Sequence, residues 1–216
     1  MSSGESHDAP YVSRGGLKLQ HALSEFALDV RGLTCADLGC STGGFTDCLL
    51  RAGAAKVYSV DTAYGQLAWT LRNDPRVVVM ERTNALHAEP RERVALVTID
   101  VSWTPQRLAL PAAAKWLACK GGAEGHGGSI VTLIKPHYER SAREPGRRGQ
   151  GGGRREVVLS EHEALDELER TLAEVRALGL SVIAHTRSPI TGGAASGNKA
   201  KGTGNVEFLA LVKPMT

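Results

Sequence analysis

Seven short apolar runs recur along the chain and alternate with polar stretches that have helical spacing. Each run has the length of a buried strand, and the runs lie at residues 33–38, 56–60, 76–80, 94–99, 129–134, 180–185 and 206–212. Strands that alternate with helices form a mostly parallel sheet with helices on both faces. The last two runs are joined by a loop, which predicts an antiparallel last strand. The pattern therefore predicts an α/β, Rossmann-like fold with seven strands, one more than the usual dinucleotide-binding fold.

Local signals place several helix ends. Residues 15–28 have helical apolar spacing. Thr104-Pro105 is typical of an N-cap followed by a first-turn proline. Residues 160–163, Ser-Glu-His-Glu, match a capping box that opens a helix ending near Gly179. The predicted buried stripe of that last helix consists of Leu165, Leu168, Leu172 and Val175.

Length and composition favour one soluble domain. The 216 residues suffice for a single domain with a sizeable core, predicted over 11–216 behind a disordered tail at 1–10. No apolar run reaches the roughly 18 residues of a membrane helix, and the first residues lack a signal-peptide core, so we expect a cytoplasmic protein that contacts no membrane. The cysteines at positions 35, 40, 48 and 119 have no metal-ligand spacing and are expected to be reduced.

Two segments combine basic side chains with glycine. Residues 140–155 contain six arginines and one glutamate, and residues 191–205 are rich in Gly, Ala and Ser and carry Lys199 and Lys201. Both have too few apolar side chains to pack, which predicts mobile basic loops at about 140–156 and 191–205. They are either solvated surface loops or clamps for a polyanion such as RNA.

The most informative segment is Asp37-Leu-Gly-Cys-Ser-Thr-Gly-Gly-Phe45, which follows an apolar run and precedes a helical pattern. A strand, a glycine turn and a helix in this order present backbone N–H groups to an extended ligand. The acid before the first glycine favours a ligand with an amine or hydroxyls. The segment therefore predicts a site for a nucleoside-like cofactor.

The identity of that cofactor follows from what the turn contains. A dinucleotide site has a second glycine where this chain has Ser41. A phosphate-binding Walker loop needs a lysine, and none lies between Val30 and Ala55. Asp61, at the end of the second run, suits ribose hydroxyls, and together with Asp37 it would repel a pyrophosphate. A cationic, phosphate-free ligand such as S-adenosylmethionine meets these requirements best.

Several motifs resemble one known family, in the family's order, from residue 11 to the end of the chain. These motifs lie at residues 11–19, 36–50, 60–67, 72–76, 133–139, 188–192 and 204–209. They resemble the hemolysin A-like (TlyA-type) methyltransferases, which belong to the FtsJ-like ribose 2′-O-methyltransferases. The resemblance implies a seven-stranded Rossmann-like fold, S-adenosylmethionine as cofactor, and RNA as acceptor, with ribosomal RNA as the expected RNA.

The resemblance also implies a Lys-Asp-Lys-Glu tetrad at Lys18, Asp100, Lys135 and Glu207. Asp100, Lys135 and Glu207 stand out independently, because they are charged residues at the ends of, or within, apolar runs. Ligands of open parallel sheets bind outside the carboxyl ends of the strands, where Asp100 and Lys135 would project. If the last strand is antiparallel, Glu207 at its start lies at the same edge. Each residue also has a plain structural interpretation, as an exposed helix, turn or strand-end charge.

Lys135 is the predicted base for the hydroxyl proton. A base that works at neutral pH needs a pKa of roughly 7–8, well below the ~10.4 of a free lysine. A second ammonium nearby would lower the pKa of Lys135, and Lys18 is the predicted source. Asp100 and Glu207 would oppose that shift and are expected to orient the two lysines.

The predicted cofactor residues surround the glycine turn and the ends of the neighbouring strands. Trp103 and Tyr138 follow strand ends and are candidates to stack on a base, although a packing role fits them equally well. The predicted cofactor set is Asp37, Gly39, Ser41, Thr42, Gly43, Gly44, Phe45, Asp61, Asn84 and Asp100.

The front of the chain departs from the family pattern. The resemblance implies a small N-terminal RNA-binding module, which this sequence lacks, so a separate RNA-binding partner is expected to replace it. The main prediction is an S-adenosylmethionine-dependent RNA ribose 2′-O-methyltransferase. Methylation of a small nucleoside or metabolite remains the alternative, and a non-enzymatic hemolysin-like or scaffold protein is a third.

Overall fold

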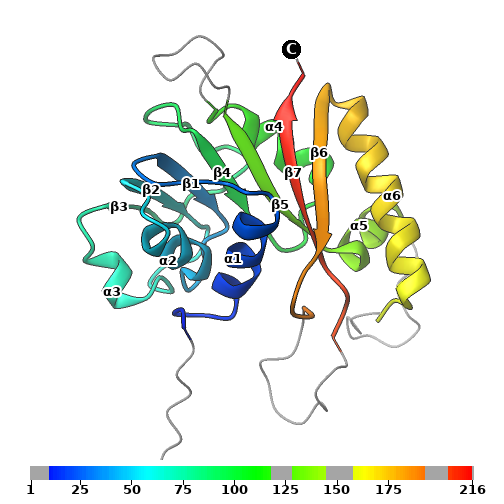
Figure 1. Ribbon diagram of the computed structural model, residues 1–216, viewed down its shortest axis with the longest axis horizontal. Coiled ribbons are helices and arrows are strands. Elements are labelled where there is room, and N and C mark those ends of the chain that lie inside the picture. The colour runs from blue at the N-terminus through cyan, green and yellow to red at the C-terminus, as the bar shows by residue number, and fades with distance from the viewer. Residues whose placement is uncertain (1–9, 118–127, 145–157, 193–203, 216) are drawn as a thin grey trace, which may run out of the picture.

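A single sheet lies between two groups of helices (Figure 1). The computed structural model describes residues 10–117, 128–144, 158–192 and 204–215. In chain order the elements are α1 Gly15–Glu25, β1 Thr34–Leu38, α2 Gly44–Arg51, β2 Lys56–Val60, α3 Trp69–Arg72, β3 Val77–Met80, β4 Leu96–Ile99, α4 Gln106–Ala114, β5 Ser129–Ile134, α5 Pro136–Arg143, α6 Glu161–Ala177, β6 Leu180–Arg187 and β7 Phe208–Pro214.

The seven strands have the order β3-β2-β1-β4-β5-β7-β6. Strands β1 to β5 pair in parallel, whereas β7 lies antiparallel between β5 and β6. The predicted sheet with an antiparallel last strand is confirmed. Glu207 was placed inside that strand, which is wrong: β7 begins at Phe208, and Glu207 immediately precedes it. Its position puts the Glu207 side chain at the edge where the parallel strands end.

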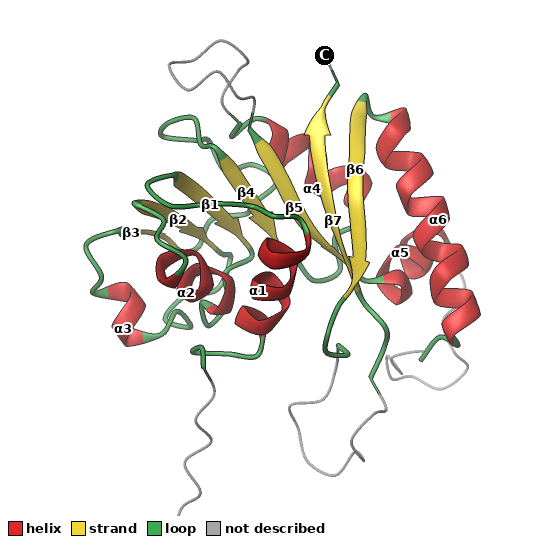
Figure 2. Cartoon of the chain, viewed as in Figure 1, coloured by secondary structure: helices red, strands yellow, loops and turns green. Residues whose placement is uncertain are grey.

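Helices cover both faces of the sheet, as Figure 2 shows. Helices α1 and α2 pack on one face through Leu19 and Leu49, together with Leu209 of β7. Helices α4 and α6 pack on the other face through Leu110 and Leu168. Side chains of β7 alternate between the two cores because successive strand residues point to opposite faces. Both cores are closed, which leaves the strand ends as the place for a ligand.

Predicted helix ends agree with the structure to within a few residues. The capping box of α6 is present, since the Ser160 side chain accepts from the Glu163 N–H and Glu163 reaches back to the Ser160 N–H. Of the four residues predicted to form the buried stripe of this helix, only Leu165 is exposed. Its neighbour Ala164 is buried instead, together with Leu168. Helix α4 begins one residue later than predicted, with Pro105 as its N-cap.

The first predicted basic loop begins later than expected. Residues up to Arg143 belong to α5, which starts with a proline in its first turn. Arg140 pairs with Glu163 at 2.9 Å, and Arg143 pairs with Glu167 and Glu174 of α6. These ion pairs explain why this part of the arginine-rich segment is helical.

Several predictions fall on other parts of the chain. The rest of the first basic loop (145–157), the centre of the second (193–203), the tail at 1–9 and Cys119 lie outside the described residues. The remaining cysteines are buried and unpaired. Within the described ranges, no helix is both long and apolar enough to cross a membrane.

Candidate active site

The glycine turn after β1 brings the start of α2 against the end of β4. Gly39 has φ +89°, a left-handed conformation that side chains rarely adopt. A Cβ atom on Gly39 would also lie 2.5 Å from the Asp100 carbonyl oxygen. Gly43 has φ +99° at the N-cap of α2. Gly39 therefore allows the turn to contact the backbone that follows β4, whereas Gly43 allows the start of α2 to pack against Leu67 and Leu71.

Asp37 does not line the site, contrary to prediction. Its side chain is fully buried beneath the turn and accepts hydrogen bonds from Thr46 Oγ1 at 2.7 Å and Thr98 Oγ1 at 3.2 Å. Burial raises its pKa to about 7, and the two hydroxyl hydrogen bonds oppose this rise. Gly43 likewise lines neither cavity described below. Both residues therefore determine the shape of the turn without lining either cavity.

The buried Asp37 carboxyl predicts a pH-dependent stability. Its folded-state pKa lies above the unfolded value, so its stabilising contribution is present at low pH and is lost as pH rises through about 7. Between pH 5 and pH 7, we expect the wild type to lose about 2 kcal/mol more unfolding free energy than Asp37→Asn. Urea unfolding at both pH values measures this difference, and parallel pH profiles would contradict it.

A carboxylate-lined cavity of about 440 Å³ lies beside the turn, between the ends of β1, β2 and β4. Asp61 Oδ2 accepts from the Ser41 N–H and Asp61 Oδ1 from the Ala63 N–H, both at 2.8 Å. Asn84 Oδ1 accepts from the Leu86 N–H at 2.9 Å. Asp61 and Asp100 are the charged residues of its lining, which includes no lysine, arginine or histidine. The cavity suits a phosphate-free nucleoside with a positive charge.

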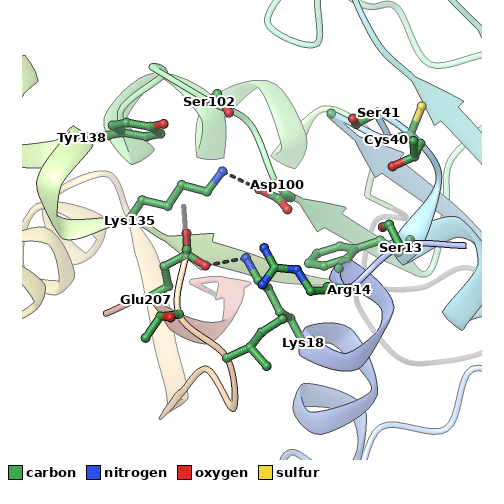
Figure 3. A pocket seen from close by; sticks show the side chains of 18 of the residues that line it. Ser13, Arg14, Lys18, Cys40, Ser41, Asp100, Ser102, Lys135, Tyr138 and Glu207 are labelled. Atoms are coloured by element: carbon green, nitrogen blue, oxygen red, sulfur yellow. Dashed lines mark hydrogen bonds and ion pairs between the residues drawn. The ribbon is translucent and has the colours of Figure 1, made fainter. Parts of the chain in front are cut away.

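A second, lysine-lined cavity of about 400 Å³ adjoins the first and shares Gly39, Ser41 and Asp100 with it (Figure 3). Lys18, Asp100, Lys135 and Glu207 all line it, together with Thr42, Gly44 and Phe45 of the turn. Lys135 Nζ lies 2.6 Å from Asp100 Oδ1, and Lys18 Nζ pairs with Glu207 Oε2. The structure thus brings the four predicted tetrad residues into one cavity: one from α1 and three from positions directly after β4, directly after β5 and directly before β7.

The pairing of the tetrad corrects the predicted electrostatics of Lys135. Burial is the largest single influence and lowers the pKa of Lys135, but Asp100, Glu207 and Tyr138 together outweigh burial, so the net shift is upward. Lys18 was expected to lower this pKa, whereas its ammonium is paired with Glu207. Burial raises the pKa of Glu207, with Lys18 opposing. Lys135 is therefore an ammonium ion in the free protein.

Sequence reasoning missed several residues that line the lysine-lined cavity. Arg14 lies one helical turn before Lys18 and projects toward the same space, as Figure 3 shows. Burial and the neighbouring Lys135 lower the pKa of His137 to about 4, so its imidazole is neutral. Tyr138, which the sequence offered with Trp103 as a candidate to stack on a base, also lines this cavity, and the two rings pack against each other with centroids 4.3 Å apart. The sequence signal that could have indicated Arg14 is its spacing of four residues from Lys18, which places the two side chains on one side of the helix.

Solved structures define the class of protein. A structure from Streptococcus thermophilus, described as a presumed hemolysin, superposes with a TM-score of 0.78 at 39% identity and covers 98% of this chain and 70% of its own. An RNA methyltransferase fold from Pyrococcus horikoshii, at 14% identity, superposes with a TM-score of 0.60 over 95% of this chain and 87% of its own. The sheet and its covering helices therefore have the fold of solved methyltransferases.

The sequence comparisons identify the family. The chain belongs to the FtsJ-like methyltransferase family, whose model matches residues 11–196, and within it to the TlyA or hemolysin A group. It is 39% identical to the Mycobacterium tuberculosis 16S/23S rRNA (cytidine-2′-O)-methyltransferase TlyA, covering 95% of this chain and 69% of that protein. It is 38% identical to hemolysin A of Brachyspira hyodysenteriae, covering 93% and 75% respectively. The chain spans 64% of the length of the Bacillus subtilis relative YqxC.

Proposed function

We propose that the chain transfers the methyl group of S-adenosylmethionine to a ribose 2′-hydroxyl of RNA, with ribosomal RNA as the substrate. The observation that carries the proposal is the cavity lined by Lys18, Asp100, Lys135 and Glu207 beside a cavity suited to the cofactor nucleoside. Methyl transfer to oxygen requires in-line alignment of acceptor, methyl carbon and sulfur, and a group that takes the hydroxyl proton. The rRNA substrate is supported by the name of the M. tuberculosis relative.

The distribution of charge supports an anionic acceptor. In the lysine-lined cavity three cations, Arg14, Lys18 and Lys135, face two carboxylates, Asp100 and Glu207. Both carboxylates are already paired with lysines, and the described residues offer Arg14 no ion-pair partner. A nucleic acid backbone supplies the missing negative charge. The carboxylate-lined cavity has the opposite character, so the two cavities separate a cationic donor from an anionic acceptor.

The roles follow from these positions. The cofactor, when bound, supplies an electrophilic methyl group on a sulfonium. Asp61 fixes the glycine turn through the Ser41 N–H and accepts from the ribose hydroxyls of the cofactor, and Asn84 lines the same cavity. Lys135 Nζ orients the acceptor hydroxyl and takes its proton, which requires that the lysine first lose its own. A positive charge bound beside Lys135 favours its neutral form, so the lysine is a stronger candidate base in the complex than alone.

Incubation of the protein with labelled S-adenosylmethionine and ribosomal subunits, followed by mapping of 2′-O-methyl sites, tests this function. We expect label in rRNA, at the ribose oxygen. Small nucleosides, tested in parallel, represent the alternative acceptor. Label that appears only in small molecules would exclude RNA as the substrate and leave the methyltransferase assignment intact.

Arg14 provides a second test, because it is the cavity residue best suited to a phosphate. We expect Arg14→Ala to raise the KM for RNA about tenfold and to leave the cofactor affinity unchanged. A plot of the logarithm of the RNA association constant against the logarithm of the salt concentration should lose about one unit of slope. Arg31→Ala is the matched control, since Arg31 is 79% exposed and pairs with Asp29 away from the cavities. Weaker cofactor binding in Arg14→Ala would assign the guanidinium to the cofactor carboxylate instead.

A further inference from the structure

Two glycines lie where the connection between β6 and β7 passes the lysine-lined cavity. Gly192 lines the cavity, and its N–H donates to the Asn205 carbonyl oxygen at 2.9 Å in an antiparallel bridge. Gly204 precedes Asn205 on the opposite side of this bridge. We call Gly192 and Gly204 the glycine clasp. Gly204 lies three residues before Glu207 along the chain.

Space, not backbone conformation, requires glycine at both positions. Neither residue is among those with positive φ, so alanine fits the backbone torsions. A Cβ atom on Gly192 would lie 2.5 Å from Glu207 Cδ and closer still to Glu207 Oε1. A Cβ atom on Gly204 would lie 2.9 Å from Thr191 Oγ1 and closer still to the Gly192 carbonyl oxygen. Gly192 therefore packs on the Glu207 carboxylate, whereas Gly204 packs on the Gly192 carbonyl group and the Thr191 hydroxyl.

The carboxylate beneath Gly192 is held from every side. Glu207 is 3% exposed and pairs with Lys18. Its carbonyl oxygen accepts from the Ser188 N–H at 2.9 Å, which fixes the backbone beside β6. Asn205 is buried, and its Oδ1 accepts from the Leu159 N–H at 3.0 Å, which ties the clasp to the segment before α6. The Gly192 backbone thus packs on a side chain that is paired with Lys18 and whose own backbone is held by hydrogen bonds.

We propose that Gly192 is a positioning residue that holds the Glu207 carboxylate against Lys18. Through this contact Gly192 fixes the direction of the Lys18 ammonium in the lysine-lined cavity. The catalytic consequence rests on the function proposed above, but the contact itself does not. The two are therefore tested by separate measurements.

A double-mutant cycle on thermal stability tests the contact. Glu207→Ala removes the three side-chain atoms that a Cβ on Gly192 would meet. We expect Gly192→Ala to lower Tm by at least about 3 °C in the wild type and by less than about 1 °C in the Glu207→Ala background. Gly204→Ala is the control, and it should lower Tm equally in both backgrounds because its Cβ atom would meet Gly192 and Thr191 rather than Glu207. Equal losses for Gly192→Ala in both backgrounds would overturn the proposal.

The cycle stays decisive if Gly192→Ala does not fold. Folding restored by the added Glu207→Ala change supports the contact, and failure of both variants overturns it. Acetylation of Lys18 by acetic anhydride, followed by mass spectrometry, measures whether the ion pair is lost. We expect at least fivefold faster labelling in Gly192→Ala than in the wild type. Unchanged labelling of a folded variant would overturn the proposal.

Activity measurements then test the catalytic consequence. In Gly192→Ala we expect kcat on rRNA to fall at least tenfold while the cofactor Kd stays within twofold, because the cofactor cavity does not contact Gly192. If the wild-type protein methylates no RNA, the proposed function is wrong. The stability and labelling results remain valid in that case, because they do not depend on methylation. A kcat within twofold of wild type, with the contact confirmed, would overturn Gly192 as a positioning residue.

Discussion

Replacement of Lys135 by alanine is expected to lower the rate of methyl transfer about a thousandfold or more while the cofactor Kd stays within twofold. Proton transfer by a positioned side chain contributes about 10²–10⁴ in rate, and Lys135 also orients the acceptor oxygen. Its ammonium lies in the lysine-lined cavity and outside the carboxylate-lined one. Single-turnover kinetics with rRNA, and calorimetry with the cofactor alone, measure the two quantities separately.

Lys56→Ala is the matched control for this experiment. Lys56 is also paired with a carboxylate, since its Nζ lies 2.8 Å from Glu92 Oε1. It begins β2, at the sheet edge opposite the site, so we expect activity within twofold of the wild type. If Lys135→Ala instead loses cofactor binding, Lys135 is a structural residue or a cofactor ligand, and the proposed base role fails.

The pH dependence of the rate reports on the same lysine. Because Asp100 raises the pKa of Lys135 above its ordinary value despite burial, the neutral form is scarce near pH 7. The wild-type rate is therefore expected to increase with pH between 7 and 9. A rate that is flat across this range would show that the removal of the hydroxyl proton does not limit turnover.

Much of this fold was predictable because buried parallel strands leave a strong pattern. Runs such as Lys56–Val60 and Ser129–Ile134 are mostly apolar and almost wholly buried, and the structure reproduces their bounds. The order of strand, glycine turn and helix after Thr34–Leu38 likewise needed only local chemistry. Three tetrad residues were visible as charges at strand ends, because parallel strands end at a common edge.

The failures have a common physical cause, which is that sequence does not reveal partners. Asp37 precedes the glycine turn, but only the packing of Thr46 and Thr98 shows that its carboxyl points into the protein. Two lysines and two carboxylates allow several pairings, and the structure selects Lys135 with Asp100. That choice reverses the predicted direction of the Lys135 pKa shift. Arg143 was assigned to a loop because its ion pairs with α6 are distant in sequence.

Replacement of Asp61 by alanine is expected to weaken cofactor binding about a hundredfold. The two carboxylate oxygens accept from the Ser41 and Ala63 N–H groups at 2.8 Å, so they connect the glycine turn to the loop after β2. Removal of these charge-assisted hydrogen bonds leaves both loops less ordered and removes the acceptor for ribose hydroxyls. Two such losses at about 1.5 kcal/mol each correspond to a factor of about a hundred. Calorimetric titration with S-adenosylmethionine or its demethylated product measures the effect.

Glu92→Ala is the control for this last experiment, because Glu92 likewise accepts two hydrogen bonds. Its Oε1 accepts from Lys56 Nζ at 2.8 Å and from the Tyr58 hydroxyl at 2.6 Å, on the opposite side of β2 from the cavities. We expect its cofactor affinity to equal that of the wild type. An equal loss in both variants would point to general destabilisation of β2. A selective loss in Asp61→Ala places the donor nucleoside in the carboxylate-lined cavity, since the only contacts changed are those that shape its wall.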